Sequence, residues 1–494
     1  MASRREQLEA YTFARRRMVA GFLQAEPGGG SEEKAPRPFR AVLPGIVIGA
    51  LILTGFGVYG LIRPGVPPGW KNKGSLIVGR DSASRYVYID GKLHPVLNIA
   101  SGRLLLDPGK FKVNLVPEKA INKVDRGAPL GIPNAPDRLP TAKEVSKPKT
   151  WTVCERPPLT ADANPQRSVF IGVAPKNGVL QGSQAMFVQL AQDRNKPNQE
   201  QPIYVVENGR SYPVKDTQVR AVLGLIPLTP QQVSQEWLNT LEPGAEITFP
   251  ELPNYGKPSR ASGLRKELAT VGVVLRADGT GQHYVVMEDA VVPISRLVAE
   301  LLVARPGARE IVYKHTASVI PVVVSDLGTN IRAGGLFGAE KGWPEELPTV
   351  VNRVEAQAPY ALTTLCNTYT GNYAGGVPQT TQSAWSDLPA PLVEGMGGVY
   401  VEPGAGALIR EVTGGADDKT GTLFLVTDSG LRYQVVNDPP KAGGGATPPG
   451  EDSEAKIRLG YKGVVPTPVP RAWTGLMPLG VPLSREAAEK PQTS

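Results

Sequence analysis

The stretch "YVYIDGKLHPVLNIASGRLL", residues 86–105, decides the fold because its pattern returns in "YVVENGRSYPVKDTQVRAVLGL", residues 204–225. In both stretches a strand-like run leads to an Asp-Gly or Asn-Gly pair, and a proline follows the glycine four positions later. Such pairs accept positive φ at both central positions of a two-residue hairpin turn. An apolar segment with helical character comes next, so each stretch predicts a strand, a turn, a short strand and a helix.

Two further stretches follow the same order, "YVVMEDAVVPISRLVAELL" at residues 284–302 and "LFLVTDSGLRYQVV" at residues 423–436. The last copy has Gln434 in place of the proline. One such unit cannot bury its apolar face alone, so neighbouring units must complete the core. The spacing between copies is irregular, which argues against a solenoid or a propeller. The predicted turn residues of the four copies are Gly91, Gly209, Asp289 and Gly430.

The order of the copies along the chain predicts the architecture. Copies two and three are neighbours, and copies one and four stand at the ends. One long insert lies between copies one and two, and a second lies between copies three and four. Cys154 lies in the first insert and Cys366 in the second. We therefore expect a pseudo-twofold body whose middle is assembled from both inserts. A disulfide between the two cysteines would clamp the inserts together, and two separate buried thiols are the alternative.

One hydrophobic span stands near the N-terminus. Residues 41–62 contain no charged side chain and are bracketed by Arg40 and Arg63. A helix of that length reaches about 33 Å, enough to cross a bilayer core. A cleaved signal peptide fits less well because forty residues precede the span. Eight Lys and Arg residues come before the span and three come just after it, which predicts a cytoplasmic N-terminus and an extracytoplasmic body.

The segment before the span, "RREQLEAYTFARRRMVAGFL" at residues 4–23, has apolar residues at three- and four-residue steps. This period predicts an amphipathic helix that lies on the inner leaflet or on a partner protein. A basic leader that only sets the membrane topology is the alternative. Residues 26–38, rich in Gly and Pro, are expected to be a linker.

Composition excludes several classes of function. The 54 basic residues face 46 acidic ones without a long basic run, which argues against nucleic-acid binding. Three histidines and two cysteines leave few metal ligands, and a structural zinc site of the usual spacing is absent from the sequence. No Gly-Lys pair completes a phosphate-binding loop, and no GxSxG motif is present. We therefore expect no catalytic, cofactor-binding or metal-binding residues.

Together, the arginine-rich start, the single span, "LHPVLNIASGRLLL" at residues 93–106, the paired cysteines and the "YPV"-type repeats resemble the EccB family. EccB is the membrane-anchored B component of the type VII (ESX) secretion core complex of actinobacteria. The resemblance implies a scaffold that joins the C, D and E components, of which C is an FtsK-like ATPase, and that self-associates through its outer domain. ATPase activity has been attributed to members of the family, but the missing phosphate-binding loop leads us to expect no enzyme.

The predicted fold is α+β: a single N-terminal transmembrane helix and an extracytoplasmic body of four ββα-like repeats in pseudo-twofold order around a central, mainly β domain. The alternative is a membrane-anchored protein that binds cell-wall peptidoglycan through exposed aromatic residues; burial of Trp151, Trp343, Trp385 and Trp473 would count against it. The expected segments are a cytoplasmic helix and linker (1–40), the span (41–62), repeat 1 (70–118), the central domain (119–200 and 306–400), repeat 2 (201–250), repeat 3 (265–305), and repeat 4 with an extended tail (401–494).

Overall fold

The computed structural model contains mixed α and β structure in two units. The anchor unit comprises residues 1–70, 79–82 and 114–123, and the body comprises residues 71–78, 83–113 and 124–494. The structure describes residues 3–23, 38–62, 65–157, 164–192, 196, 199–327, 329–337, 341–352, 364–392, 398–413, 421–436 and 452–492.

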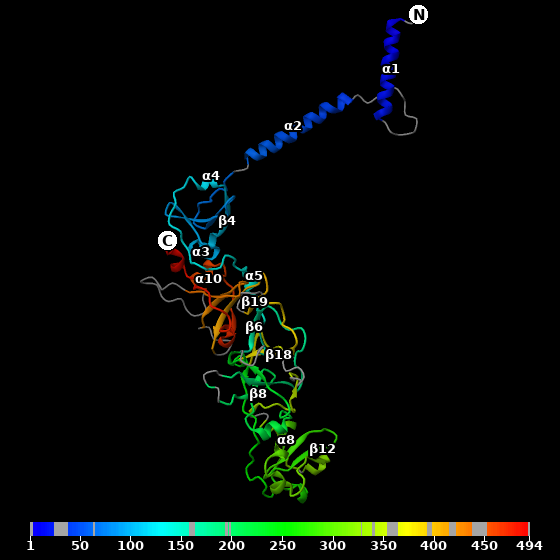
Figure 1. Ribbon diagram of the computed structural model, residues 1–494, viewed down its shortest axis with the longest axis vertical. Helices are drawn as coiled ribbons and strands as arrows, with labels where there is room; N and C mark the ends of the chain where they lie inside the picture. Colours follow the sequence, from blue (N-terminus) through cyan, green and yellow to red (C-terminus); the bar gives the residue numbers. More distant parts are fainter. Residues whose placement is uncertain are drawn as a thin grey trace. The chain divides into compact units, whose positions relative to one another are not determined.

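The anchor unit contains the two longest helices, α1 (Arg4–Leu23) and α2 (Pro38–Ile62) (Figure 1). Within α2, Val42–Gly60 is long and apolar enough to cross a membrane, with a mean hydropathy of 2.0. Helix α1 has apolar residues at the expected steps, but Arg15 lies within the same stripe, so apolar and charged residues are weakly segregated. Arg40 falls in the first turn of α2, whereas Arg63 and residues 24–37 lie outside the described residues.

The body contains four antiparallel meanders of three strands, and each meander is followed by a short helix. The first has β1 (Ser75–Gly79), β2 (Arg85–Ile89), β3 (Lys92–Pro95) and α3 (Ile99–Leu105). The second has β7 (Gln184–Leu190), β8 (Ile203–Glu207), β9 (Arg210–Pro213) and α6 (Thr217–Val222). The third has β12 (Val274–Ala277), β13 (His283–Val286), β14 (Val291–Ile294) and α8 (Arg296–Ala304). The fourth has β20 (Ala407–Val412), β21 (Leu423–Val426), β22 (Arg432–Gln434) and α10 (Glu454–Arg458).

A later strand joins three of these meanders in parallel beside the first strand. These strands are β10 (Gln231–Val233) on β7, β15 (Ile320–Val322) on β12 and β23 (Thr467–Pro470) on β20. The second sheet also includes β11 (Glu242–Pro243) and β16 (Thr349–Val350). Strand β4 (Lys112–Val116) lies beside β1 in the first sheet. Short α-helices elsewhere in the chain are α4 (Glu118–Ile121), α5 (Ala142–Val145), α7 (Gln235–Leu238), α11 (Arg471–Thr474) and α12 (Arg485–Glu489).

The hairpins show how local sequence sets the strand register. Asp90-Gly91 and Asn208-Gly209 have positive φ at both positions, as a two-residue hairpin turn requires. In the third meander the Met287 amide donates to the Ala290 carbonyl (2.8 Å), which places Glu288 and Asp289 at the centre of the turn, and neither of them has positive φ. The proline of each of the first three copies lies opposite a tyrosine, and Gln434 lies opposite Phe424; the proline pairs are Tyr86 with Pro95, Tyr204 with Pro213, and Tyr284 with Pro293.

A fifth sheet, the central sheet, is assembled from both inserts. Its order is β18-β17-β5-β6-β19, with β5 (Trp151–Arg156) and β6 (Gln166–Ile171) from the first insert and β17 (Thr364–Ala374), β18 (Val377–Trp385) and β19 (Val399–Val401) from the second. Strands β7 and β15, which the sequence-based boundaries assign to the central domain, pair instead with the second and third meanders. Both lie outside the four repeated stretches of sequence, so the repeat pattern does not reveal which sheet they join.

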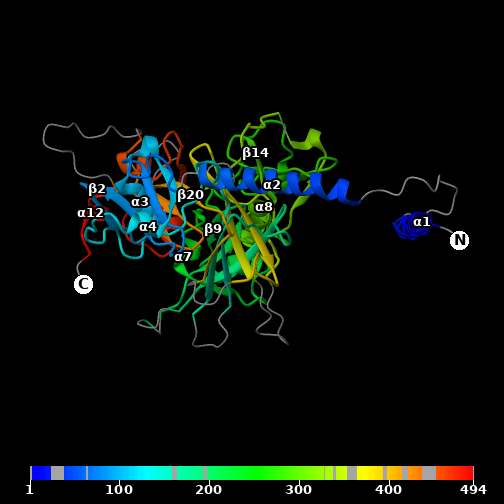
Figure 2. The same ribbon diagram turned by 90° about the horizontal axis from the view of Figure 1, so that it is seen from above.

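Three apolar cores link these sheets within the body. One combines α3 with β20–β22, one combines the central sheet with β7, β8, β20 and β21, and one combines the second and third meanders. The C-terminal segment runs back to the first meander, where α12 lies beside α3 in both views (Figures 1 and 2). Its end is fixed by a bridge between Pro491 and Leu130.

Candidate functional site

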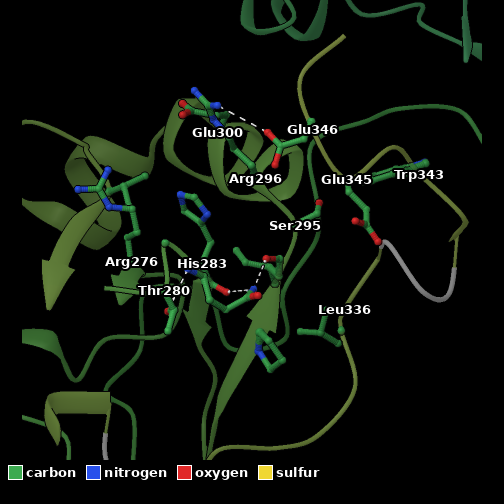
Figure 3. A pocket seen from close by; sticks show the side chains of 16 residues that line it. Arg276, Thr280, His283, Ser295, Arg296, Glu300, Leu336, Trp343, Glu345 and Glu346 are labelled. Atoms are coloured by element: carbon green, nitrogen blue, oxygen red, sulfur yellow. Dashed lines mark hydrogen bonds and ion pairs between the residues drawn. The ribbon is translucent and has the colours of Figure 1, made fainter. Parts of the chain in front are cut away.

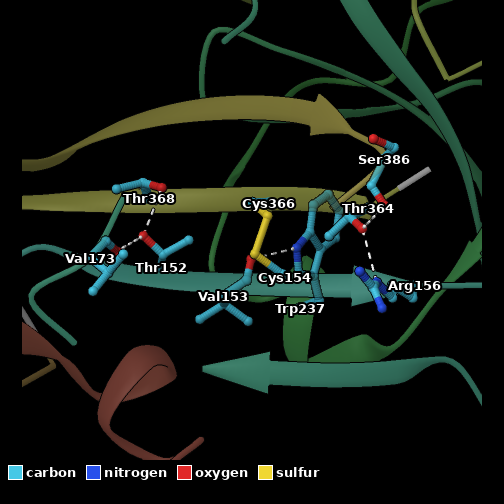
Figure 4. Close-up of a disulfide and its surroundings, with 10 residues drawn as sticks. All are labelled: Thr152, Val153, Cys154, Arg156, Val173, Trp237, Thr364, Cys366, Thr368 and Ser386. Atoms are coloured by element: carbon cyan, nitrogen blue, oxygen red, sulfur yellow. Dashed lines mark hydrogen bonds between the residues drawn. A yellow bond between two sulfur atoms is a disulfide. The ribbon is translucent and has the colours of Figure 1, made fainter. Parts of the chain in front are cut away.

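A disulfide links Cys154 of β5 with Cys366 of β17, two neighbouring strands of the central sheet (Figure 4). The two residues are direct register partners, and 212 residues separate them in the chain. Both are buried against Phe170, so the bond lies inside the protein and not at a reactive surface. Of the two arrangements that the sequence left open, the structure therefore has the disulfide.

Buried hydrogen bonds hold the two strands together around the disulfide (Figure 4). Thr152 and Thr368 share a hydrogen bond of 3.0 Å between their hydroxyls, and Arg156 Nε donates to the Thr364 hydroxyl (3.0 Å). The indole N–H of fully buried Trp237, on α7, donates to the Val153 carbonyl (3.2 Å). These contacts join β5 to β17 and to α7.

A buried carboxylate ties this sheet to helix α7. Glu155 is fully buried, and one of its oxygens accepts from the Ser234 amide (2.9 Å) while the other accepts from the Ser234 hydroxyl. Ser234 also caps α7 through the Trp237 amide (3.1 Å). Burial raises the pKa of Glu155, and the two bonds from Ser234 oppose that shift. A charge at this depth needs such donors, and the amide and hydroxyl of Ser234 supply two of them.

The hairpin turn of the second meander docks on the central sheet. The Gly209 amide donates to Gln382 Oε1 (2.7 Å), and Gln382 Nε2 donates to Asn367 Oδ1 (2.8 Å). Next to the turn, Glu207 is buried, and its Oε2 has no hydrogen-bond partner among the described residues. Desolvation raises the pKa of Glu207 to about 7. The junction therefore contains a carboxyl group that titrates near neutral pH.

A cavity of about 900 Å³ lies at the third meander (Figure 3). Arg276 and His283 come from β12 and β13, and Arg296 at the start of α8 pairs with Glu346 (3.6 Å). Burial lowers the pKa of His283, with Arg276 adding to the effect, which favours the neutral ring. Among the described residues, the ring forms no hydrogen bond with a hydroxyl or a carboxylate.

The tryptophans test the wall-binding alternative. Trp151, Trp343 and Trp473 are at most 3% exposed, whereas Trp385 is 46% exposed. Glycan binding by aromatic stacking needs several exposed rings on one surface, and these four do not form one. Trp473 packs against Tyr369 with ring centroids 5.9 Å apart, so it belongs to the central core.

The structure brings only some of the sequence-predicted residues together. Cys154 and Cys366 meet in the central sheet, while the turn residues Gly91, Gly209, Asp289 and Gly430 stand in four separate sheets. Sequence reasoning missed Glu155, Ser234 and Glu207. The signal for Glu155 was an acid inside the apolar strand "WTVCER", but its partner lies 79 residues away, and no local pattern indicates that distance.

Comparisons with known proteins agree on one family. The family model described as "Type VII secretion system ESX-1, transport TM domain B" matches residues 1–492. The ESX-3 secretion system ATPase EccB3 of Mycolicibacterium smegmatis is 26% identical over 510 residues, covering 97% of this chain and 89% of that protein. A chain of an intact ESX-5 inner membrane complex shares 23% identity and a TM-score of 0.62, covering 100% of this chain and 96% of that one. A chain of the EccB3 dimer from the ESX-3 core complex shares 24% identity and a TM-score of 0.62, covering 84% and 99%. At these identities the two structures show a common fold.

Proposed function

Because the chain belongs to the EccB family of type VII secretion proteins, we propose that it is a structural membrane component of an ESX-type secretion core complex. The observation that carries the proposal is the extent of the family match, which includes both α2 and the whole body. The fold supports it as well, since a chain of an ESX-5 inner membrane complex has the same fold over the full length of this chain.

The proposed partners are the C, D and E components, among them the FtsK-like ATPase, and further copies of this chain. The related EccB3 was solved as a dimer from the ESX-3 core complex, which supports self-association through the extracytoplasmic domain. We place the N-terminus in the cytoplasm and the body outside the membrane, because basic residues concentrate before α2.

The chain acts in this proposal as a scaffold and not as an enzyme, although curated relatives are named ATPases. A phosphate-binding loop presents successive backbone amides at the start of a helix and supplies Lys followed by Ser or Thr. Gly91-Lys92 instead stands at a hairpin turn and Gly256-Lys257 in a loop, and Leu93 and Pro258 follow them. Purified protein that hydrolyses ATP at a rate abolished by a substitution in this chain would refute the scaffold.

We further propose that the four meanders are repeats in pseudo-twofold order. Their equal strand order supports this, as do the tyrosine–proline register pairs of the first three and the capped helices of all four, whose N-caps are Asn98, Asp216, Ser295 and Ser453. The apolar cores support the same order, because repeats 1 and 4 share one core and repeats 2 and 3 share another. With the observed strands, repeat 2 begins near residue 184 and repeat 3 extends to about residue 322.

Mild-detergent extraction of the C-terminally tagged protein from native membranes tests the function. A native gel should show a band of high mass, and mass spectrometry should find an FtsK-like ATPase and a protein with many membrane spans in it. A monomer or dimer that carries only cell-wall fragments would contradict the proposal and favour the wall-binding alternative.

A further inference from the structure

Positive charge is concentrated in the segment that follows the hydrophobic span. Residues 65–126 contain eleven Lys and Arg against five Asp and Glu. Residues 127–494 contain 34 against 36. Most of the excess positive charge of the chain outside its N-terminal segment therefore lies directly after α2.

Part of this charge is gathered into one surface of the body by backbone hydrogen bonds. The Asp107 amide donates to the Lys73 carbonyl (3.1 Å), and the Lys112 amide donates to the Gly74 carbonyl (2.9 Å). Gly74 packs so closely on the backbone of Lys110 that a Cβ at this position would clash. Lys73, Lys110 and Lys112 thus lie near one another, and we call them, with Lys71, the lysine patch.

The lysine patch is exposed and has little internal neutralisation. Lys73, Lys110 and Lys112 are exposed and form no ion pair with any described residue. The carboxylate of Asp107 accepts a hydrogen bond from the Gly109 amide (3.3 Å) and is the acid closest in sequence to Lys110.

The chain length ties this surface to the membrane. Lys71 comes nine residues after Ile62, the last residue of α2. Nine residues span at most about 30 Å when fully extended. A basic surface held this near a bilayer is attracted by anionic headgroups. An acidic protein would need to reach the same confined position, so the tether favours lipid.

We propose that the lysine patch binds anionic lipid headgroups of the leaflet from which α2 emerges. The proposal rests on α2 spanning the membrane and not on its orientation. Lipid phosphates would accept hydrogen bonds from the lysine ammonium groups. Such contacts would restrict how the body moves on its tether.

The test uses the full chain in nanodiscs of phosphatidylcholine alone and of phosphatidylcholine mixed with phosphatidylglycerol. Acetylation of each lysine is followed by mass spectrometry, with exposed Lys143 and Lys266 as internal controls. The four patch lysines, Lys71, Lys73, Lys110 and Lys112, should react at least about threefold more slowly in anionic discs at about 0.15 M salt, and the difference should vanish near 1 M salt. The control lysines should react equally in both discs.

A charge-reversed variant separates lipid binding from local burial. In K73E/K110E/K112E, the protection of the remaining Lys71 in anionic discs should be lost, whereas K143E/K147E/K266E should retain it. Equal rates for the patch lysines in the two kinds of disc would overturn the proposal. Protection in neutral discs on adding inorganic phosphate would also overturn it, since the bound anion would then come from solution.

Discussion

Cys154 of β5 and Cys366 of β17 face each other as register partners in one sheet, and the chain between them contains the whole of the second and third meanders. The disulfide therefore closes a covalent loop around half of the body. Both ends of that loop lie in the central sheet, so the bond holds together the two chain segments that lead into the second meander and out of the third.

Removing this bond should destabilise the body strongly. We expect C154S/C366S to lower the free energy of unfolding by about 3–5 kcal/mol, because the unfolded chain regains the entropy of a 212-residue loop. Thermal unfolding in detergent, with and without reductant, measures the effect. Reductant should lower the melting temperature of the wild type and leave that of the variant unchanged. Equal melting temperatures of the wild type and the variant without reductant would contradict the prediction.

Sequence reasoning succeeded where a local pattern has a strong physical cause. The Asp90-Gly91 and Asn208-Gly209 pairs predict their turns because both positions need positive φ, and the apolar run of residues 41–62 predicts α2. It did not indicate which sheet β7 and β15 join, because both strands lie outside the four repeated stretches. It also missed Glu155, because the donors that permit its burial are brought to it by tertiary packing.

Ser234 should matter more than its role as a helix cap suggests. Ser234→Ala removes the N-cap of α7 and one donor to buried Glu155, for an expected cost of about 2–3 kcal/mol. Ser484→Ala is the matched control, because Ser484 caps α12 through the Ala487 amide (3.1 Å) without a buried acid. It should cost only about 1 kcal/mol. Equal losses in chemical denaturation would show that the Glu155 contact contributes nothing.

Glu207 should make stability depend on pH. Its pKa rises from 4.5 to about 7 in the folded protein. Between these values the folded state keeps a proton that the unfolded state has released, so stability falls as pH rises from 4.5 to about 7. Glu207→Gln should therefore stabilise the protein at pH 8 by about 1–2 kcal/mol, after allowance for solvent screening, and have little effect at pH 4. Exposed Glu251→Gln is the control and should leave the melting temperature unchanged at both pH values; a Glu207→Gln effect independent of pH would exclude the titration.

Two tryptophans separate packing from surface binding. Trp473→Ala should cost about 3–5 kcal/mol, because the ring is 1% exposed in the central core. Trp385→Ala should cost less than about 1 kcal/mol, since nearly half of the side chain faces solvent. Melting temperatures test both, and a peptidoglycan pull-down tests the wall-binding alternative. Loss of pull-down in Trp385→Ala alone would revive that alternative.

The proposed orientation can be tested with single introduced thiols, because the disulfide leaves no free cysteine. Ser3→Cys places a thiol before α1, and Ser262→Cys places one at an exposed position of the body. In intact cells a membrane-impermeant maleimide should label Ser262→Cys and not Ser3→Cys. Permeabilisation should then expose Ser3→Cys, which shows that its thiol is reactive. The reverse pattern would mean that the basic residues before α2 lie outside, and the charge argument for a cytoplasmic N-terminus would then be wrong.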